Sequence, residues 1–256
     1  MIKNFFKKTS NKEIAKKEEM GWFSTFMLAA FFAIIFRSFF YEPFHIPSGS
    51  MKPNLLIGDY IFVSKMSYGY TKYSLPFGYK FNYFNDRIFS KNPQRGDVAV
   101  FRMPGNENIN YIKRIIGVPG DKVQIKNGQI FINNKKIIQK QSSKFRDIDR
   151  STKQELIIDQ YSESITSDKN ILILDQAKNT PQDNSGIYNV PKNHYFVMGD
   201  NRDNSRDSRY IDVGFIPHQN FIGKAKIIFF STSKPIWYIF SWFDSIRFSR
   251  IFDKIE

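Results

Sequence analysis

The longest apolar run of this chain lies near its N-terminus. Residues 22–41 read WFSTFMLAAFFAIIFRSFFY, and Arg37 is the only charged residue among them. As a helix this run is about 30 Å long, which matches the apolar thickness of a bilayer. Arg37 lies close enough to the end of the run for its side chain to reach the membrane interface. The pattern predicts one transmembrane helix, an anchor over residues 21–41.

Two other structures are compatible with this run, a buried core helix and a cleaved signal peptide. The apolar part of a signal peptide is usually shorter and ends at small residues, whereas residues 39–43 here read FFYEP. We therefore expect a retained anchor. Residues 1–20 contain six lysines and three glutamates. By the positive-inside rule, residues 1–20 are expected in the cytoplasm and residues 42–256 on the other side of the membrane.

After Pro43 the pattern changes to short runs rich in Val, Ile, Phe and Tyr, separated by Gly, Pro and Asn. These runs predict strands at residues 60–64, 97–102, 111–117, 122–126, 129–132, 194–198 and 224–230. The pair Asn127-Gly128 between two of them predicts a type I′ hairpin. The expected fold class is mainly β, with the single transmembrane helix followed by an antiparallel β domain, either a sandwich or an irregular barrel.

Two segments depart from this strand pattern. Residues 139–186 are polar and weakly periodic, which predicts a solvent-facing insertion. Residues 235–252 read PIWYIFSWFDSIRFSRIF and mix aromatic residues with arginine at helical spacing. This second pattern predicts a helix, which either lies in the membrane interface or packs on the β core.

Composition excludes several classes of chemistry. The 256 residues contain no cysteine, so disulfides, thiolate metal sites and a cysteine nucleophile are excluded. Three histidines without an H-E-x-x-H pattern argue against a metal site, and we expect none. The net charge of +14 suits nucleic acid or an anionic membrane. Because the basic residues are scattered among acids and form no nucleic-acid motif, we expect no nucleic-acid partner.

A serine and a lysine are the first candidates for chemistry. Residues 46–53 read IPSGSMKP, in which two prolines and a glycine predict a rigid turn that carries Ser50. In the predicted strand 111–117, Lys113 shares a face with Tyr111 and Ile115, and burial there would lower its pKa. A serine nucleophile needs such a base. From these patterns alone, a polar connecting loop and a lysine on a solvated face are the better interpretations.

The segment 198–210 reads MGDNRDNSRDSRY, and its carboxylates invite comparison with a calcium loop. An EF-hand needs Gly at its sixth position and Glu at its twelfth. Counted from Asp200, these positions are Ser205 and Ile211. Alternating Asp and Arg instead predict an ion-paired, rigid turn that can orient the Ser205 side chain.

Taken in order, PSGSM, GD at residues 58–59, YIKR, GVPGD and GDNRDNSRDSR follow one membrane span. In this order the chain resembles the bacterial type I signal peptidases from residue 1 to about 230. The resemblance implies a β catalytic domain over residues 42–256 with a second β subdomain inserted at about residues 124–189. It also implies an enzyme without a cofactor, a serine endopeptidase.

The resemblance also implies residue roles. Ser50 matches the nucleophile, Lys113 the general base, and Ser205 the residue that orients the lysine amine. Ser48, together with the backbone N–H of Ser50, matches the oxyanion hole. Structural ion-pair positions around the site are matched by Arg114, Asp200, Arg202, Asp207 and Arg209.

Two neighbouring positions bear on this resemblance. Asn54 departs from the family pattern, which usually has Thr there, and this leaves the local hydrogen bonding open. Met51 matches a position at the membrane-facing edge of the site.

The expected substrates are signal peptides of exported preproteins, with small residues at positions −1 and −3. Partners would include the lipid bilayer, and a secretion translocon is left open. The expected location is the bacterial inner membrane, with one span, a cytoplasmic N-terminus and an extracytoplasmic catalytic domain.

Other functions account for less of the sequence. A Ser–Lys autoprotease of the repressor type would need a DNA-binding domain and a cytoplasmic location. Ser231 and Lys234 have the S-x-x-K spacing of penicillin-binding proteins, but S-D-N and K-T-G are missing. A His-based triad lacks its G-x-S-x-G elbow. A membrane-anchored β-rich binding module would leave the motifs unexplained.

Overall fold

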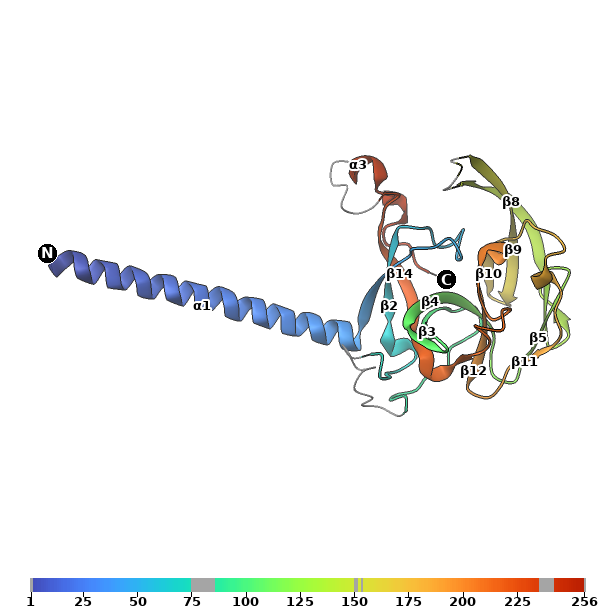
Figure 1. Cartoon of the computed structure of the whole chain (residues 1–256), viewed down its shortest axis with the longest axis horizontal. Coiled ribbons are helices and arrows are strands. Elements are labelled where there is room, and N and C mark those ends of the chain that lie inside the picture. The colour runs from blue at the N-terminus through green and yellow to red at the C-terminus, as the bar shows by residue number, and fades with distance from the viewer. Residues whose placement is uncertain (1, 75–85, 150–151, 153, 235–241, 256) are drawn as a thin grey trace.

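The structure is a computed structural model that describes residues 2–74, 86–149, 152, 154–234 and 242–255. Helix α1 covers Ile2–Phe39 and projects away from a body of β-strands (Figure 1). Its segment Gly21–Phe39 is long and apolar enough to cross a membrane, and only 6% of its apolar window is buried. This low burial excludes the core-helix alternative. The helix ends at Phe39, slightly before the predicted residue 41, because Tyr41 already begins a strand.

The main sheet has seven antiparallel strands in the order β1-β2-β14-β3-β4-β12-β13. Its strands are β1 Tyr41–His45, β2 Asp59–Ser64, β3 Val98–Met103, β4 Asn106–Gly117, β12 His194–Met198, β13 Ile216–Pro217 and β14 Phe221–Ser231. Each strand predicted for this part of the chain is present. The sheet brings β4, from the middle of the chain, between β3 and β12.

Two smaller antiparallel sheets come from the chain between β4 and β12. One has four strands in the order β11-β5-β6-β7, and the other three in the order β10-β9-β8. Their strands are β5 Lys122–Lys126, β6 Gln129–Ile132, β7 Lys135–Lys136, β8 Gln139–Ile148, β9 Glu155–Thr166, β10 Lys169–Leu174 and β11 Tyr188–Asn189. Asn127 and Gly128 have φ values of +49° and +76° between β5 and β6, as a type I′ turn requires.

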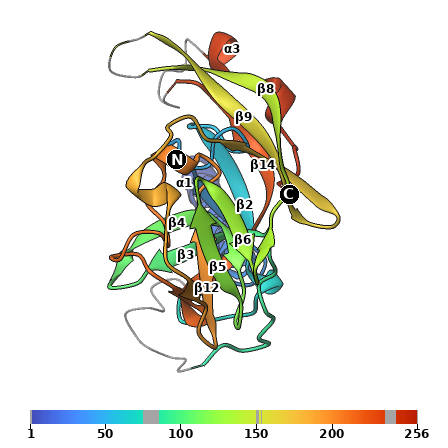
Figure 2. The same ribbon diagram turned by 90° about the vertical axis from the view of Figure 1, so that its right-hand side faces the viewer.

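The predicted polar insertion at residues 139–186 is thus largely β structure. Strands β8 and β9 form a long ribbon that extends beyond the rest of the small sheets (Figure 2). The outer half of this ribbon is exposed, as at Ile148 and Ile157. A strand without a buried face shows no regular alternation of apolar and polar residues, which is why the sequence pattern was weak there.

Short 3-10 helices connect the strands. They are η1 Lys65–Ser67, η2 Pro181–Asp183, η3 Arg202–Asn204, η4 His218–Asn220 and η6 Phe248–Arg250. η3 lies inside the predicted rigid turn between β12 and β13.

The predicted helix at residues 235–252 is not continuous in the described part of the chain, which contains two short helices and an extended tail. Residues 235–241 lie outside the described residues, and the remainder contains the four-residue helix α3, Trp242–Ser245, and the 3-10 helix η6. The following tail is extended along β14, where the Ile228 N–H donates to the Asp253 carbonyl and the Ile255 N–H to the Lys226 carbonyl. These edge hydrogen bonds favour an extended backbone over the helix that the aromatic spacing indicated.

The loop between β1 and β2 is held from below by apolar side chains. Ile46, Met51 and Leu55 are each at most 2% exposed and belong to one core cluster with Ile61 and Val63 of β2. Met51 is therefore a core residue, and its place relative to the membrane stays a prediction. Three buried side chains around Ser50 fix the path of its loop over the sheet.

Candidate active site

Ser50 and Lys113 meet across the sheet. The Nζ atom of Lys113 lies 2.7 Å from the Oγ atom of Ser50. Ser50 is placed by the loop between β1 and β2, and Lys113 by the inner strand β4, opposite Ala99 of β3. The two side chains are only 7% and 5% exposed. A serine hydroxyl thus has an amine within proton-transfer distance in a largely dry site.

Burial makes the neutral form of Lys113 more accessible. Ile115, on the same face of β4, is fully buried, whereas the Tyr111 ring, whose centroid lies 5.3 Å from Nζ, favours the charged amine. Burial lowers the pKa of Lys113 from 10.5 to about 8, although Asp207 and Asp200 act in the opposite direction. Nζ also donates a hydrogen bond of 3.0 Å to the Ile112 carbonyl, which limits its orientation. A lysine with this pKa supplies a useful fraction of free amine near neutral pH.

Ser48 and the Ser50 amide belong to the same loop between β1 and β2. Ser48 is exposed, two residues before the candidate nucleophile. Within the described part of the chain, neither the Ser48 hydroxyl nor the Ser50 N–H has a hydrogen-bond partner in the protein. Both donors therefore remain available to a ligand at Ser50.

Ser205 lies beside this pair, but its hydroxyl donates to Asp207. The Ser205 Oγ atom is 2.7 Å from Asp207 Oδ2. Gly199 allows the approach of Ser205 to the loop, because a Cβ there would lie 2.2 Å from Ser205 Oγ and 2.5 Å from the Ser50 carbonyl oxygen. The orienting role of Ser205 toward Lys113 stays a prediction.

Buried ion pairs surround the site. Arg114 binds both oxygens of Asp200, with Nε–Oδ1 and Nη2–Oδ2 distances of 2.8 Å, and donates to the Gly96 carbonyl. Arg209 binds Asp207 at 2.8 Å. Burial by itself would raise the pKa of Asp207. The ion pair with Arg209 and the hydrogen bonds from the Gly199 N–H and the Ser205 hydroxyl outweigh burial, and the pKa is lowered.

The segment 198–210 is thus only partly paired within itself. Arg202 pairs with Glu163 of β9, and Asp200 with Arg114 of β4. Sequence reasoning did not identify Glu163, because nothing in the β9 pattern indicates which distant arginine it meets.

Two asparagines tie the Ser50 loop to this scaffold, and sequence reasoning missed one of them. Asn201 donates its backbone N–H to the Ser50 carbonyl and its side-chain amide to the Gly49 carbonyl, each at 3.1 Å. Asn54 donates to Asp200 Oδ2 and to the Leu172 carbonyl, each at 2.7 Å. Asn54 therefore links the Ser50 loop directly to the ion pair of Asp200 and Arg114.

The second serine–lysine spacing has a structural role. Ser231 is fully buried, its hydroxyl donates to Asp59 at 2.7 Å, and it accepts a hydrogen bond from Arg247. Lys234 is exposed. This arrangement excludes the S-x-x-K pair as a second nucleophile–base pair.

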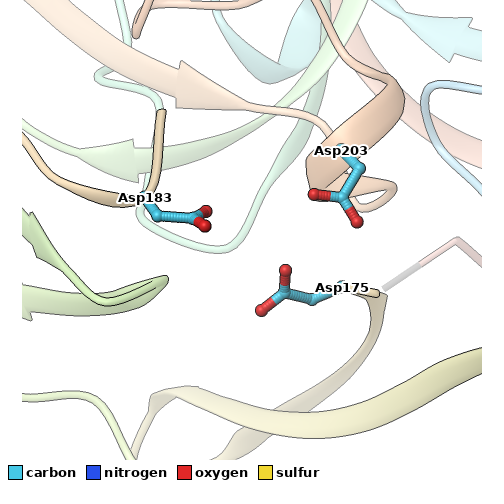
Figure 3. Close-up of side chains that lie close together, drawn as sticks. All are labelled: Asp175, Asp183 and Asp203. Atoms are coloured by element: carbon cyan, nitrogen blue, oxygen red, sulfur yellow. The ribbon is translucent and has the colours of Figure 1, made fainter. Parts of the chain in front are cut away.

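Three carboxylates, Asp175, Asp183 and Asp203, come together away from any histidine (Figure 3). One oxygen of each lies within 4.8 Å of the others. Asp183 accepts from the Thr180 N–H, Asp203 accepts from two backbone N–H groups, and Asp175 lies 3.8 Å from a lysine amine. These contacts give the cluster a structural role in the turns around β10 and η3.

A buried serine beside a lysine of lowered pKa, on an antiparallel β domain behind an apolar helix, defines a serine peptidase with a lysine base. The family described as "Signal peptidase, peptidase S26" matches residues 19–230. The chain belongs to this signal peptidase family and is a serine endopeptidase.

Relatives match over almost the whole chain. Signal peptidase I of Rickettsia typhi is 37% identical, with 96% of this chain and 96% of the relative covered. Signal peptidase I of Rickettsia bellii is 38% identical, with 98% and 90% covered. A crystal structure of a signal peptidase I from Enterococcus faecalis is 25% identical, has a TM-score of 0.30, and covers 52% of this chain and 97% of that chain.

Proposed function

We propose that this protein removes signal peptides from exported preproteins at the outer face of the bacterial inner membrane. The observation that carries this proposal is the buried contact of 2.7 Å between Ser50 Oγ and Lys113 Nζ. The match to the signal peptidase family and the relatives named signal peptidase I support it. The apolar segment Gly21–Phe39 supports anchoring beside a substrate that is itself held in the membrane.

The proposed reaction is acyl transfer to Ser50. The neutral amine of Lys113 accepts the hydroxyl proton as Ser50 Oγ attacks the carbonyl carbon of the scissile peptide bond. The Ser50 N–H and the Ser48 hydroxyl donate to the developing oxyanion, and one such donor contributes about 3–4 kcal/mol. Protonated Lys113 then gives its proton to the leaving amine. A water molecule, deprotonated by Lys113, attacks the acyl-enzyme and releases the cleaved signal peptide.

The remaining site residues would position this pair. Ser205 would accept a hydrogen bond from the Lys113 amine while its own hydroxyl donates to Asp207, which Arg209 holds in place. Arg114, Asp200 and Arg202 would keep the strands and the Ser50 loop in register.

The proposed topology places residues 1–20 in the cytoplasm, the span within residues 21–41, and residues 42–256 outside. Within the outer part, residues 124–189 would form the inserted subdomain, which corresponds to the two small sheets. Substrates would carry small residues at positions −1 and −3. Contact with a secretion translocon stays a prediction.

The direct test uses the full chain in detergent with a purified preprotein. Wild-type protein should release the mature product, and Ser50→Ala and Lys113→Arg should not, because a guanidinium stays protonated at any accessible pH. Ser142→Ala, on the exposed strand β8, is the matched control and should cleave normally. Near-normal turnover by Ser50→Ala, with no contaminating peptidase, would contradict the proposal.

A further inference from the structure

A groove lined by aromatic side chains lies where α1 meets the main sheet. Its volume is about 600 Å³, and its lining residues are Phe36, Tyr41, Phe62, Ile227, Lys226 and Lys254. Phe36 belongs to the apolar span Gly21–Phe39, and the other residues belong to β1, β2, β14 and the C-terminal tail. The groove therefore lies at the junction of the anchor and the β body, where the C-terminal end of α1 meets the strands (Figure 1).

One wall of the groove is a continuous line of rings. Phe36 and Tyr41 have centroids 6.1 Å apart, and Tyr41 and Phe62 have centroids 6.2 Å apart. Phe62 in turn stacks on Phe229 with a centroid distance of 4.2 Å. Aromatic side chains are enriched at the level of lipid headgroups, where one end of a ligand is apolar and the other is wet. This wall suits the glycerol and the first acyl carbons of a lipid.

Two lysines stand at the rim of the groove. Lys226 and Lys254 are exposed, and neither has a carboxylate within ion-pair distance among the described residues. The other two cations at this junction, Arg37 and Lys65, both pair with Glu42 at 2.9 Å. The groove is thus cationic, and its two lysines, unlike Arg37 and Lys65, share no carboxylate among the described residues.

The charges around Lys226 strengthen this contrast. Burial and the nearby Lys224 and Lys169 lower the pKa of Lys226, and Asp97 alone opposes them. The Asp97 carboxylate already binds the Lys224 amine and the Tyr68 hydroxyl. An external anion beside Lys226 would therefore meet a local excess of positive charge.

We propose that this groove binds one anionic phospholipid, with its phosphate between Lys226 and Lys254 and its glycerol end against Tyr41 and Phe62. A lipid fits better than a soluble anion because the ring wall continues into the membrane-spanning helix. The proposal rests on the anchoring of α1 in a bilayer. It does not depend on the cleavage chemistry, since no hydrogen bond or ion pair links the lining residues to Ser50 or Lys113 in the described chain.

The test is native mass spectrometry of the full chain released from detergent after exposure to phosphatidylglycerol or phosphatidylcholine with the same acyl chains. Wild-type protein should retain phosphatidylglycerol in preference. Lys226→Glu/Lys254→Glu should lose that preference by roughly tenfold or more, at about fivefold per lysine. The matched control Lys135→Glu/Lys136→Glu changes two exposed lysines on β7 and should keep the preference.

Three results would overturn the proposal. The first is that wild-type protein retains phosphatidylcholine as well as phosphatidylglycerol. The second is that the β7 control loses the preference as much as Lys226→Glu/Lys254→Glu does. The third is that glycerol phosphate displaces the bound lipid at the same concentration as free phosphatidylglycerol. Cleavage of a short soluble peptide by Lys226→Glu/Lys254→Glu at the wild-type rate will show that the variant is folded. If that variant does not fold, Lys226→Gln/Lys254→Gln should show the same direction of loss, and an unchanged lipid preference would contradict the proposal.

Discussion

Arg114 and Asp200 form a two-point ion pair in which each side chain is only 1% exposed. The pair joins β4 to the turn after β12. Arg114 follows Lys113 in β4, and Asn201 follows Asp200 and donates to the Ser50 carbonyl. The Arg114–Asp200 ion pair therefore fixes the strand that carries the candidate base against the turn that holds the loop of the candidate nucleophile.

We expect Asp200→Ala to destabilise the protein strongly. Removing one partner leaves the Arg114 guanidinium buried without its counter-ion, which costs about 3–5 kcal/mol of unfolding free energy in comparable pairs. Chemical denaturation in detergent measures the effect. The double variant Arg114→Met/Asp200→Leu should recover much of this stability but little of the activity. Equal stability of Asp200→Ala and wild type would show that the pair does not hold the two segments together.

Asn54 should matter through the hydrogen bonds it donates. Asn54→Ala removes two of them, at about 1 kcal/mol each, and should lower kcat by several-fold with a small change in KM. Asn54→Asp should be worse, because it places a second carboxylate beside Asp200 Oδ2, which the amide now contacts at 2.7 Å. Steady-state kinetics on a peptide substrate will rank the variants. If Asn54→Asp is as active as wild type, the hydrogen bonds donated by Asn54 do not position the site.

The strands were predictable because their buried faces impose a pattern. In β5 the buried residues Val123 and Ile125 alternate with more exposed neighbours, and Asn127-Gly128 supplies the turn that closes the hairpin. The ribbon of β8 and β9 was not predicted as strands because its outer half is exposed on both faces. The alternation of apolar and polar residues reflects which side chains are buried, so a strand with few buried side chains shows little alternation.

The helix predicted for the C-terminal tail is not continuous in the structure for a related reason. The spacing of aromatic residues and arginines at 242–252 indicated a helix, but Arg250 turns inward to bind Asp59 and the Asn54 carbonyl. Its partners lie almost the length of the β domain away in sequence, so no local pattern reports them. The same holds for the pairing of Arg202 with Glu163.

The residues of the site were predicted mainly from the order of the sequence motifs along the chain. The turn around Ser50 and the strand of Lys113 were local predictions, and the resemblance supplied their proximity. The structure places Lys113 Nζ 2.7 Å from Ser50 Oγ.

Arg250→Ala should destabilise the protein much more than Arg206→Ala. Asp59 is fully buried, and Arg250 is its nearest cation at 2.6 Å, while Arg247 is 3.7 Å away. Loss of the Arg250 side chain should lower the free energy of unfolding by about 2–4 kcal/mol, because the buried Asp59 carboxylate would keep only its weaker contact with Arg247. Arg206 and Asp212 pair at the surface, where such a contact is worth at most about 1 kcal/mol. Similar denaturation midpoints for the two variants would contradict this ranking.

The absence of cysteine permits a clean test of topology. Ile211→Cys introduces a thiol at a fully exposed position of the β body, and Lys12→Cys introduces one before the span. In intact cells, a membrane-impermeant maleimide should label position 211 and spare position 12, and both should react after the membrane is permeabilised. Labelling of position 12 alone in intact cells would reverse the proposed orientation.

The central claim is that neutral Lys113 acts as the base for Ser50. Burial lowers the pKa of Lys113 to about 8, so the fraction of free amine grows as the pH rises through that value. The rate constant kcat/KM reports the ionisation of the free enzyme. It should therefore be low in the acid range, rise with the loss of one proton, and level off above the pKa.

The measurement that tests this claim most directly is the pH dependence of kcat/KM for a peptide substrate cleaved by the full chain. We expect a single rise centred near pH 8, in line with the lowered pKa of Lys113. A solvated lysine would place the rise near about 10.4, and a histidine base near about 6.5. A rise at either of those values, or a flat profile from about pH 7 to 10, would contradict the assignment of Lys113 as the base.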